Sequence, residues 1–334
     1  MSRSDTIPVV DFTPFVSGGD LEKRKTATVI RDACEGIGFF YLTNHGVPDR
    51  LSRGIFDETR RFFSLPMDVK LEPSLRVTPQ RNRGYQPMSS RLYANAGAPD
   101  LNEGFKYQLD LPPDDPDVVA GDRVHQLNRW PDDLPGWREA LQDYYVEMER
   151  LMRRLLRAFG LALDLDEGFF LDFYRKPITQ IILLHYPPQD PMSPADAYGI
   201  RPHTDATSFT IVNQDEVGGM QVSGTGGWID AVPIPGTFLI NIGDMMARWT
   251  NGRFASTQHR VYNRTGRERY SVPFFAIPDF DAVVECLPSC KGPGNPPKYP
   301  PLHVGQSLQN RFATNWTPGL RKDEPARSAG GSAA

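Results

Sequence analysis

The clearest pattern of hydrophobic and polar positions lies between Pro135 and Gly160. Hydrophobic residues recur there at spacings of three and four, which places them on one face of an α-helix. We therefore expect one long amphipathic helix over this segment. Shorter runs of the same kind predict helices over residues 20–35 and 48–66, and apolar runs at residues 6–15 and 39–48 predict short strands.

The pattern changes after residue 179, where short β-prone runs alternate with turns rich in glycine and proline. These runs include QIILLHYPP, TSFTIVNQ, GMQVSG, TFLINIGDMM, STQHRVYN and RYSVPFFAIP. Closely spaced strands of this kind are typical of a sandwich or a jelly roll and not of a doubly wound sheet. We expect residues 72–130 to form a long loop region with short elements. No linker divides the chain, so we expect one integrated domain.

Composition supports this fold class and narrows the function. The 334 residues include 29 glycines and 31 prolines, which suits many turns. The formal net charge of −4 gives no reason to expect nucleic acid as a partner, and no run of 18 apolar residues predicts a membrane span. Three cysteines are too few for a disulfide framework, so we expect a cytoplasmic protein.

The segment RPHTDATSFT carries the first chemical signal. His203 and Asp205 stand two residues apart before a β-prone run, and His259 lies in a later run of the same kind. Residues two apart on a strand point to one face, so His203 and Asp205 can reach one metal ion. Two histidines and one carboxylate form the facial triad of non-haem Fe(II) oxygenases, which leaves positions open for O2 and a chelating co-substrate.

A second pair follows ten residues after His259. Arg269 and Ser271 also share one face of a predicted strand. The planar guanidinium fork suits a carboxylate, and the serine hydroxyl can add a further donor. The pattern is therefore His-x-Asp, a gap, His, and then Arg-x-Ser.

At this point the chain resembles a known family, the iron(II)- and 2-oxoglutarate-dependent dioxygenases, in the branch that contains isopenicillin N synthase and the plant flavonoid and gibberellin oxidases. The resemblance extends from IPVVDF to ATNWTP. It rests on the order and spacing of DACEGIGFFYLTNHGVP, FFSLPMDVK, RGYQP, HYPP, HTDATSFTIVNQDEVGGMQV, PGTFLINIGDMMARWTNGRFASTQHRV and RERYSVPFF.

The resemblance implies a mainly β fold, with a double-stranded β-helix (jelly-roll) core over residues 166–317. A helical N-terminal region over residues 1–165 would pack on this core, and residues 318–334 would form a mobile tail. The implied protein is a monomeric oxygenase that uses Fe(II), 2-oxoglutarate and O2. It would couple decarboxylation of 2-oxoglutarate to hydroxylation, desaturation or cyclisation of a small organic molecule, without nucleic acid or membrane as a partner.

The resemblance also assigns roles to residues. It makes His203, Asp205 and His259 the iron ligands, and Arg269 and Ser271 the pair that binds the distal carboxylate of 2-oxoglutarate. Tyr186, in HYPP, becomes a further co-substrate contact.

One position departs from the family pattern. Plant members often carry an asparagine two residues before this tyrosine, whereas here Leu184 occupies the position. A contact with the co-substrate is therefore missing or replaced.

By analogy with the family, residues 81–107 form the wall of the substrate site. The aromatic residues of this stretch are the expected substrate contacts, in particular Tyr85, Phe105 and Tyr107.

Four other functions remain open at the level of sequence. The first is an oxidase of the isopenicillin N synthase type, which does not use 2-oxoglutarate, and the second is an enzyme that breaks 2-oxoglutarate down to ethylene. The third is a zinc hydrolase, because two histidines, a carboxylate and water also suit zinc. The fourth is a binding module without catalysis, which the complete triad disfavours.

Overall fold

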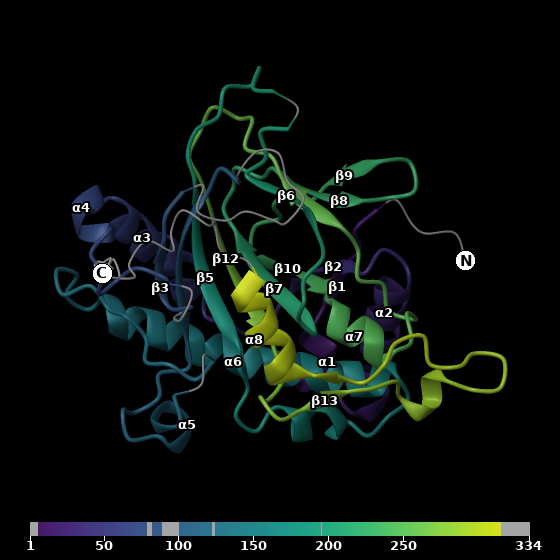
Figure 1. Ribbon diagram of the computed structural model, residues 1–334. Coiled ribbons are helices and arrows are strands. Elements are labelled where there is room, and N and C mark those ends of the chain that lie inside the picture. The colour runs from purple at the N-terminus through teal and green to yellow at the C-terminus, as the bar shows by residue number, and fades with distance from the viewer. Residues whose placement is uncertain (1–5, 79–81, 89–99, 122–123, 195, 315–334) are drawn as a thin grey trace, which may run out of the picture.

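The computed structural model of the protein describes residues 6–78, 82–88, 100–121, 124–194 and 196–314. Two sheets form its centre (Figure 1). The main sheet has eight strands, in the order β1 (Val9–Asp11), β2 (Phe39–Thr43), β10 (Thr237–Ile242), β7 (Phe209–Gln214), β12 (Arg269–Ala276), β5 (Gln180–Tyr186), β4 (Glu103–Gln108) and β3 (Gly84–Gln86).

The minor sheet has four strands and packs against part of the main sheet. All its strand pairs are antiparallel, and those of the main sheet are too, apart from the parallel pair β1–β2. A buried apolar cluster that includes Phe39, Val212, Met220 and Val222 joins the two sheets. The strands of the minor sheet are β6 (Ile200–His203), β11 (His259–Val261), β8 (Met220–Ser223) and β9 (Trp228–Asp230).

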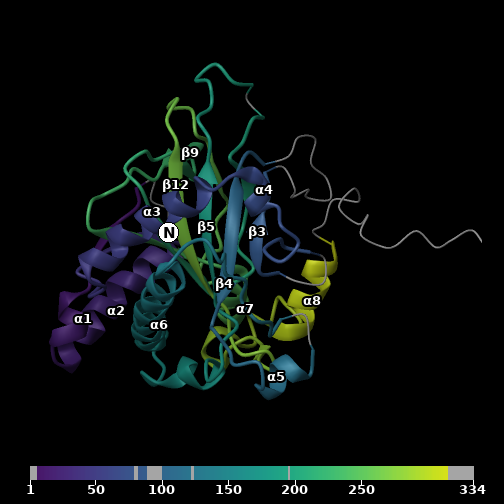
Figure 2. The same cartoon turned by 90° about the vertical axis from the view of Figure 1, so that its left-hand side faces the viewer.

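Helices cover both sides of the main sheet. Figure 2 shows α1, α2 and α6 on one side and α8 on the other. A two-stranded sheet of β13 (Val283–Val284) and β14 (Leu302–His303) precedes α8. The helices are α1 (Thr13–Ser17), α2 (Asp20–Glu35), α3 (Asp49–Phe63), α4 (Met67–Lys70), α5 (Pro116–Val119), α6 (Trp137–Ala162), α7 (Asp244–Trp249) and α8 (Val304–Thr314), with 3-10 turns at η1 (Phe169–Phe173) and η2 (Pro288–Cys290).

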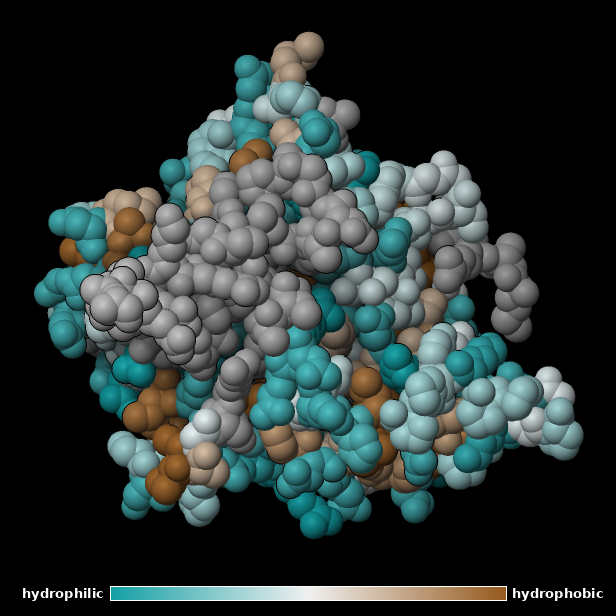
Figure 3. Space-filling model, viewed as in Figure 1, coloured by the Kyte–Doolittle hydropathy of each residue, from teal (hydrophilic) through white to brown (hydrophobic). Residues whose placement is uncertain are grey.

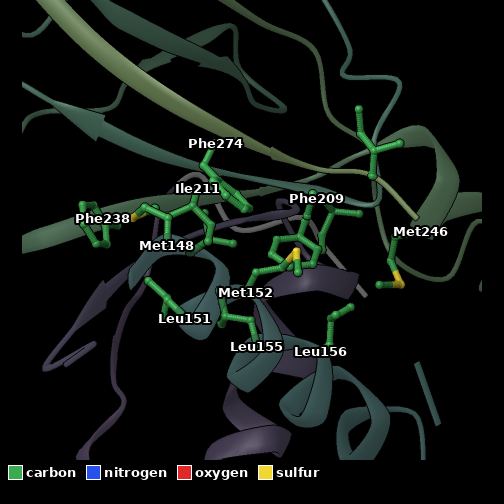
Figure 4. Close-up of a cluster of buried hydrophobic side chains, with 14 of the residues drawn as sticks. Met148, Leu151, Met152, Leu155, Leu156, Phe209, Ile211, Phe238, Met246 and Phe274 are labelled. Carbon is green, nitrogen blue, oxygen red and sulfur yellow. The ribbon is translucent and has the colours of Figure 1, made fainter. Parts of the chain in front are cut away.

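The long helix predicted from hydrophobic periodicity is confirmed as α6, which passes Gly160 and ends at Ala162. Its buried face includes Met148 and Met152, which point toward Phe209 and Ile211 of β7 (Figure 4). Burying a side chain of this size contributes roughly 1.5–3 kcal/mol. This contact fixes the main sheet against the helical layer.

The N-terminal region contains strands as well as helices, among them the two predicted over residues 6–15 and 39–48. It supplies β1 and β2 at one edge of the main sheet and β3 and β4 at the other. Residues on both sides of the expected boundary at 165 therefore share one sheet. The expected tail over residues 318–334 lies outside the described part of the chain. Within that part, no helix is both long and apolar enough to pass through a bilayer.

Strand β4 is one of the short elements within the long loop region expected over residues 72–130. All six of its residues are buried. On the face turned toward α3 and α6, Glu103 accepts hydrogen bonds from Lys70 Nζ (3.0 Å) and the Tyr85 hydroxyl (2.6 Å). Its other carboxylate oxygen lies 2.7 Å from Nδ1 of His185. The buried carboxylate of Glu103 thus links β4 to α4, β3 and β5 through polar contacts.

We predict that Glu103→Gln lowers the free energy of unfolding by about 3–5 kcal/mol, because it leaves the buried ammonium of Lys70 without its counter-charge. Urea unfolding at neutral pH measures this loss, and the exposed Glu285→Gln is the matched control. A loss no larger than that of the control would show that the buried pair does not stabilise the fold.

The same residue predicts a pH dependence. Burial acts to raise the pKa of Glu103, but hydrogen bonds from His185, Tyr85 and Lys70 outweigh it and hold this pKa below its ordinary value of 4.5. A carboxyl with a lowered pKa stabilises the fold above that ordinary value and loses the contribution as the pH falls below it. The stability difference between wild type and Glu103→Gln should therefore shrink in acid.

Candidate active site

The two histidines of the predicted triad lie on neighbouring strands of the minor sheet. His203 ends β6, His259 begins β11, and the two residues are paired across the antiparallel strands. Asp205 follows just beyond the end of β6. Its Oδ1 lies 3.6 Å from Nε2 of His203 and 3.8 Å from Nε2 of His259. The ligand atoms of all three lie within 4.8 Å of one another, so one metal ion can bind all of them.

Backbone carbonyls orient both imidazole rings toward this point. Nδ1 of His203 lies 2.8 Å from the carbonyl oxygen of Arg201, and Nδ1 of His259 lies 3.2 Å from that of Thr257. A carbonyl can only accept, so each Nδ1 carries the proton and donates it. Each Nε2 then keeps its lone pair for a metal ion, as is usual for histidine ligands.

One carboxylate oxygen of Asp205 is held by hydrogen bonds, and the other is directed at the metal site. Its Oδ2 accepts hydrogen bonds from Thr210 Oγ1 (2.6 Å) and Asn241 Nδ2 (2.8 Å). Burial acts to raise the pKa of Asp205, but His259, His203 and these two hydrogen bonds outweigh it and lower the pKa. The carboxylate therefore stays charged, with Oδ1 directed at the histidine nitrogens.

Asn241 is a residue of this site to which the sequence analysis assigned no role. It lies in β10 and is fully buried. A single polar residue inside the apolar run TFLINI was a usable signal, because a buried amide needs a hydrogen-bond partner. The partner itself could not be read from the sequence, since Asp205 belongs to a different segment.

The second predicted group gathers on β12 and β5 of the main sheet. Arg269 pairs with Tyr186 across the two strands. Nη1 of Arg269 donates to Ser271 Oγ (3.4 Å), the Tyr186 hydroxyl lies 3.4 Å from the same Oγ, and the guanidinium carbon stands 4.5 Å from the centre of the Tyr186 ring. The structure thus brings together all three residues that the sequence assigned to a carboxylate.

Arg269 is the most informative of the three. Its side chain is fully buried, its Nε donates to the carbonyl of Gly218, and its Nη2 has no hydrogen-bond partner among the described residues. No described carboxylate forms an ion pair with it. Since a buried charge is costly unless it is paired, this geometry fits a site for an anionic ligand.

Both groups line one cavity of about 160 Å³. A cavity of roughly 150 Å³ admits a benzene-sized molecule, so this one suits small molecules. Apolar side chains line it between the two groups, among them Leu184, Ile200 and Val261. Leu184 therefore adds apolar surface where many plant members of the resembled family carry an amide.

The expected aromatic substrate contacts lie elsewhere. Tyr85, Phe105 and Tyr107 are fully buried in the hydrophobic core against α3 and α6, and none of them lines the cavity. These aromatics face away from the cavity, because alternate residues of a strand point to opposite sides. Lys106 and Gln108, which alternate with these aromatics on β4, line the cavity instead.

Comparison with known proteins agrees with this geometry. Residues 7–133 match the family model described as the non-haem dioxygenase in morphine synthesis N-terminal. Residues 178–278 match the 2OG-Fe(II) oxygenase superfamily.

Individual relatives extend over nearly the whole chain. A 2-oxoglutarate-Fe(II) type oxidoreductase of Emericella nidulans is 35% identical over 92% of this chain and 90% of its own length. The crystal structure of a full-length Neurospora crassa protein in complex with alpha-KG and thymine is 30% identical, has a TM-score of 0.81 and covers 92% of this chain and 96% of that one. JOX2 in complex with 2OG, Fe and JA is 29% identical, with a TM-score of 0.77, over 94% of this chain and 87% of that one.

These matches confirm the jelly-roll fold and the class of enzyme that the sequence predicted. Fe(II), 2-oxoglutarate and O2 are its cofactor and co-substrates, and small molecules are its substrates. The residues present fit this set, since three side chains that could bind a metal ion share one cavity with a buried arginine that no described carboxylate pairs with. The chain belongs to the 2OG-Fe(II) oxygenase superfamily.

Proposed function

We propose that His203, Asp205 and His259 hold the Fe(II) ion and that this protein hydroxylates a small organic molecule. The observation that supports the ligand assignment is the convergence of Nε2, Nε2 and Oδ1 on one point, with their second polar atoms held by the protein. When bound, iron supplies the activation of O2. Three protein ligands on one face leave the remaining coordination positions for O2 and the co-substrate.

Arg269 is the residue that binds the distal carboxylate of 2-oxoglutarate in this proposal, with Ser271 and Tyr186 beside it. A carboxylate there satisfies Nη2 and compensates the buried charge in one step. In the coupled reaction, one atom of O2 enters succinate as CO2 leaves, and the other enters the C–H bond of the substrate. The apolar side chains around Leu184 keep water away from the reacting atoms.

The proposal also covers the cellular location, the oligomeric state and the partners of the enzyme. We place it in the cytoplasm, as a monomer with neither nucleic acid nor membrane as a partner. The formal net charge of −4 and three buried, unpaired cysteines support this placement. The part of the face in Figure 3 that is not drawn in grey carries separate hydrophobic patches.

The hydrogen bond from Asn241 to Asp205 gives a test of the metal site that removes no ligand. We predict that Asn241→Leu weakens Fe(II) binding about 10–100-fold, the usual effect of losing a group that orients a ligand. The loss of this hydrogen bond should be partly offset in stability, because Oδ1 of Asn241 is buried with no hydrogen-bond partner among the described residues and leucine removes that atom. Anaerobic Fe(II) titration and thermal unfolding measure the two effects.

Thr237→Val is the control for this experiment. Thr237 begins the same strand but bonds only to the carbonyl of Ile234, so its loss should leave Fe(II) affinity intact. If Asn241→Leu bound Fe(II) as tightly as this control, Asn241 would not position the ligand.

The co-substrate assignment is tested at Arg269. Truncating one partner of a buried charged pair typically costs 2–5 kcal/mol, so Arg269→Ala should raise the apparent 2-oxoglutarate constant by at least about 30-fold, at ~1.4 kcal/mol per decade. Arg269→Lys should recover only part of the affinity, because it keeps the charge but loses the fork. Ser271→Ala should cost about 1 kcal/mol, or roughly fivefold.

Fe(II) binding should survive these changes, since none of them removes a ligand. Arg267→Ala is the matched control, because this neighbouring arginine is exposed and pairs only with Glu216 at the surface. If wild type turned over without 2-oxoglutarate and Arg269→Ala had unchanged kinetics, the protein would be an oxidase of the isopenicillin N synthase type instead.

A further inference from the structure

The three side chains of the metal site come from two separate segments of the chain. His203 and Asp205 belong to the end of β6 and the turn after it, whereas His259 begins β11. The two strands pair, but their register shifts between His259 and Val261. Such an irregularity disrupts the ladder locally, so the ladder alone holds the two segments less firmly at this point. Contacts outside the ladder must help to fix their spacing.

One side chain, that of Asp244, bridges the two segments. Its Oδ2 accepts a hydrogen bond from Oγ1 of Thr204 (3.3 Å), the residue between the first two ligands. Its Oδ1 accepts a hydrogen bond from Oγ of Ser256 (2.7 Å), three residues before the third ligand. A single carboxylate that belongs to neither segment therefore connects both of them.

Asp244 is itself held in place by the backbone around it. It begins α7, directly after β10. Its N–H donates to the carbonyl of Asp205 (2.8 Å), and the N–H of Met245 donates to the carbonyl of Thr207 (2.9 Å). Gly243 lies so close to Thr207 that a Cβ on this glycine would stand 2.3 Å from the carbonyl oxygen. The carboxylate thus extends from a segment that is packed against the turn after β6.

The hydrogen bonds of this carboxylate go outside its own helix. Acidic residues are common in the first turn of a helix because they interact favourably with the helix dipole. The cap residue of α7 is Gly243, which has no polar side chain, and both oxygens of Asp244 accept from hydroxyls of other segments. The geometry therefore favours a role in joining segments over a role in starting α7.

We propose that Asp244 is a positioning residue for the iron site. It sets the spacing between the first two ligands and His259, and through this spacing it sets the affinity for Fe(II). Its effect differs from that of Asn241, which orients the carboxylate of Asp205 alone. This inference rests on the proposed function, because it assumes that the three side chains hold the metal ion.

Anaerobic Fe(II) titration of Asp244 variants tests the proposal. Asp244→Ala should weaken Fe(II) binding about 10–100-fold, the usual effect of losing a group that orients metal ligands. Asp244→Asn should recover most of the affinity, because an amide can still accept from one hydroxyl and donate to the other. Asp20→Ala is the matched control, since Asp20 also begins a helix, α2, but is exposed. It should bind Fe(II) like wild type.

Ser256→Ala tests the bridge independently. Alone, it should weaken Fe(II) binding by less than Asp244→Ala does, because the hydrogen bond from Thr204 remains. Added to Asp244→Ala, it should change the affinity by no more than about twofold, because the bridge is already broken. Thermal unfolding of the metal-free variants sets the temperature below which each titration is made, so that only folded protein is compared.

Unchanged Fe(II) affinity in Asp244→Ala, or a loss that Asp244→Asn does not restore, would overturn the proposal. So would an effect of Ser256→Ala that is just as large when Asp244 is absent. If Asp244→Ala does not fold, Ser256→Ala and Thr204→Val decide, and unchanged Fe(II) affinity in both would contradict the bridge. Failure of the proposed function would look different, because His259→Ala would then bind Fe(II) as tightly as wild type.

Discussion

A buried guanidinium that forms no ion pair with any carboxylate in the described part of the chain determines how this cavity works. Arg269 is fully enclosed, and taking a charge out of water costs several kcal/mol unless it is compensated. The carbonyl of Gly218, the hydroxyl of Ser271 and the face of Tyr186 supply part of that compensation. In the proposed function, the distal carboxylate of 2-oxoglutarate supplies the rest.

The arrangement depends on how the two sheets pack. Both histidines stand on the minor sheet, whereas Arg269 stands on the main sheet. Asp205 connects the sheets, because it follows β6 in the chain and is hydrogen-bonded by Thr210 of β7 and Asn241 of β10. Phe39 of β2 also packs edge-on against His259 at 5.5 Å between ring centres. The separation between metal and co-substrate is therefore set by side-chain packing between sheets.

Most of what the sequence could predict about the site came from the two-residue repeat of a β-strand. His203 with Asp205, and Arg269 with Ser271, could be grouped because residues two apart share a face. On β4 the aromatics were named as substrate contacts by analogy with the family, without a predicted strand that would have separated its two faces. Their polar neighbours line the cavity instead. Apolar residues usually face the interior of a protein, but a cavity that binds polar ligands needs polar side chains on its wall.

What the sequence could not give were contacts between distant segments. Strand β4 was missed because both of its faces are buried and it has no clean alternation of apolar and polar residues. The partner of Asn241 depends on the alignment of β10 with β7, which only the folded sheet defines. The zinc hydrolase and the binding module, which the triad alone left open, are set aside by the family to which the chain belongs.

The central claim is that Arg269 is compensated by the distal carboxylate of 2-oxoglutarate. The most direct measurement compares the affinity of the anaerobic Fe(II)-loaded protein for 2-oxoglutarate and for 2-oxopentanoate, which keeps the chelating keto acid but ends in a methyl group. We expect 2-oxoglutarate to bind at least about 30-fold more tightly, since only it can pair with the buried guanidinium. Equal affinities would contradict the account, because Arg269 would then serve some purpose other than binding the co-substrate.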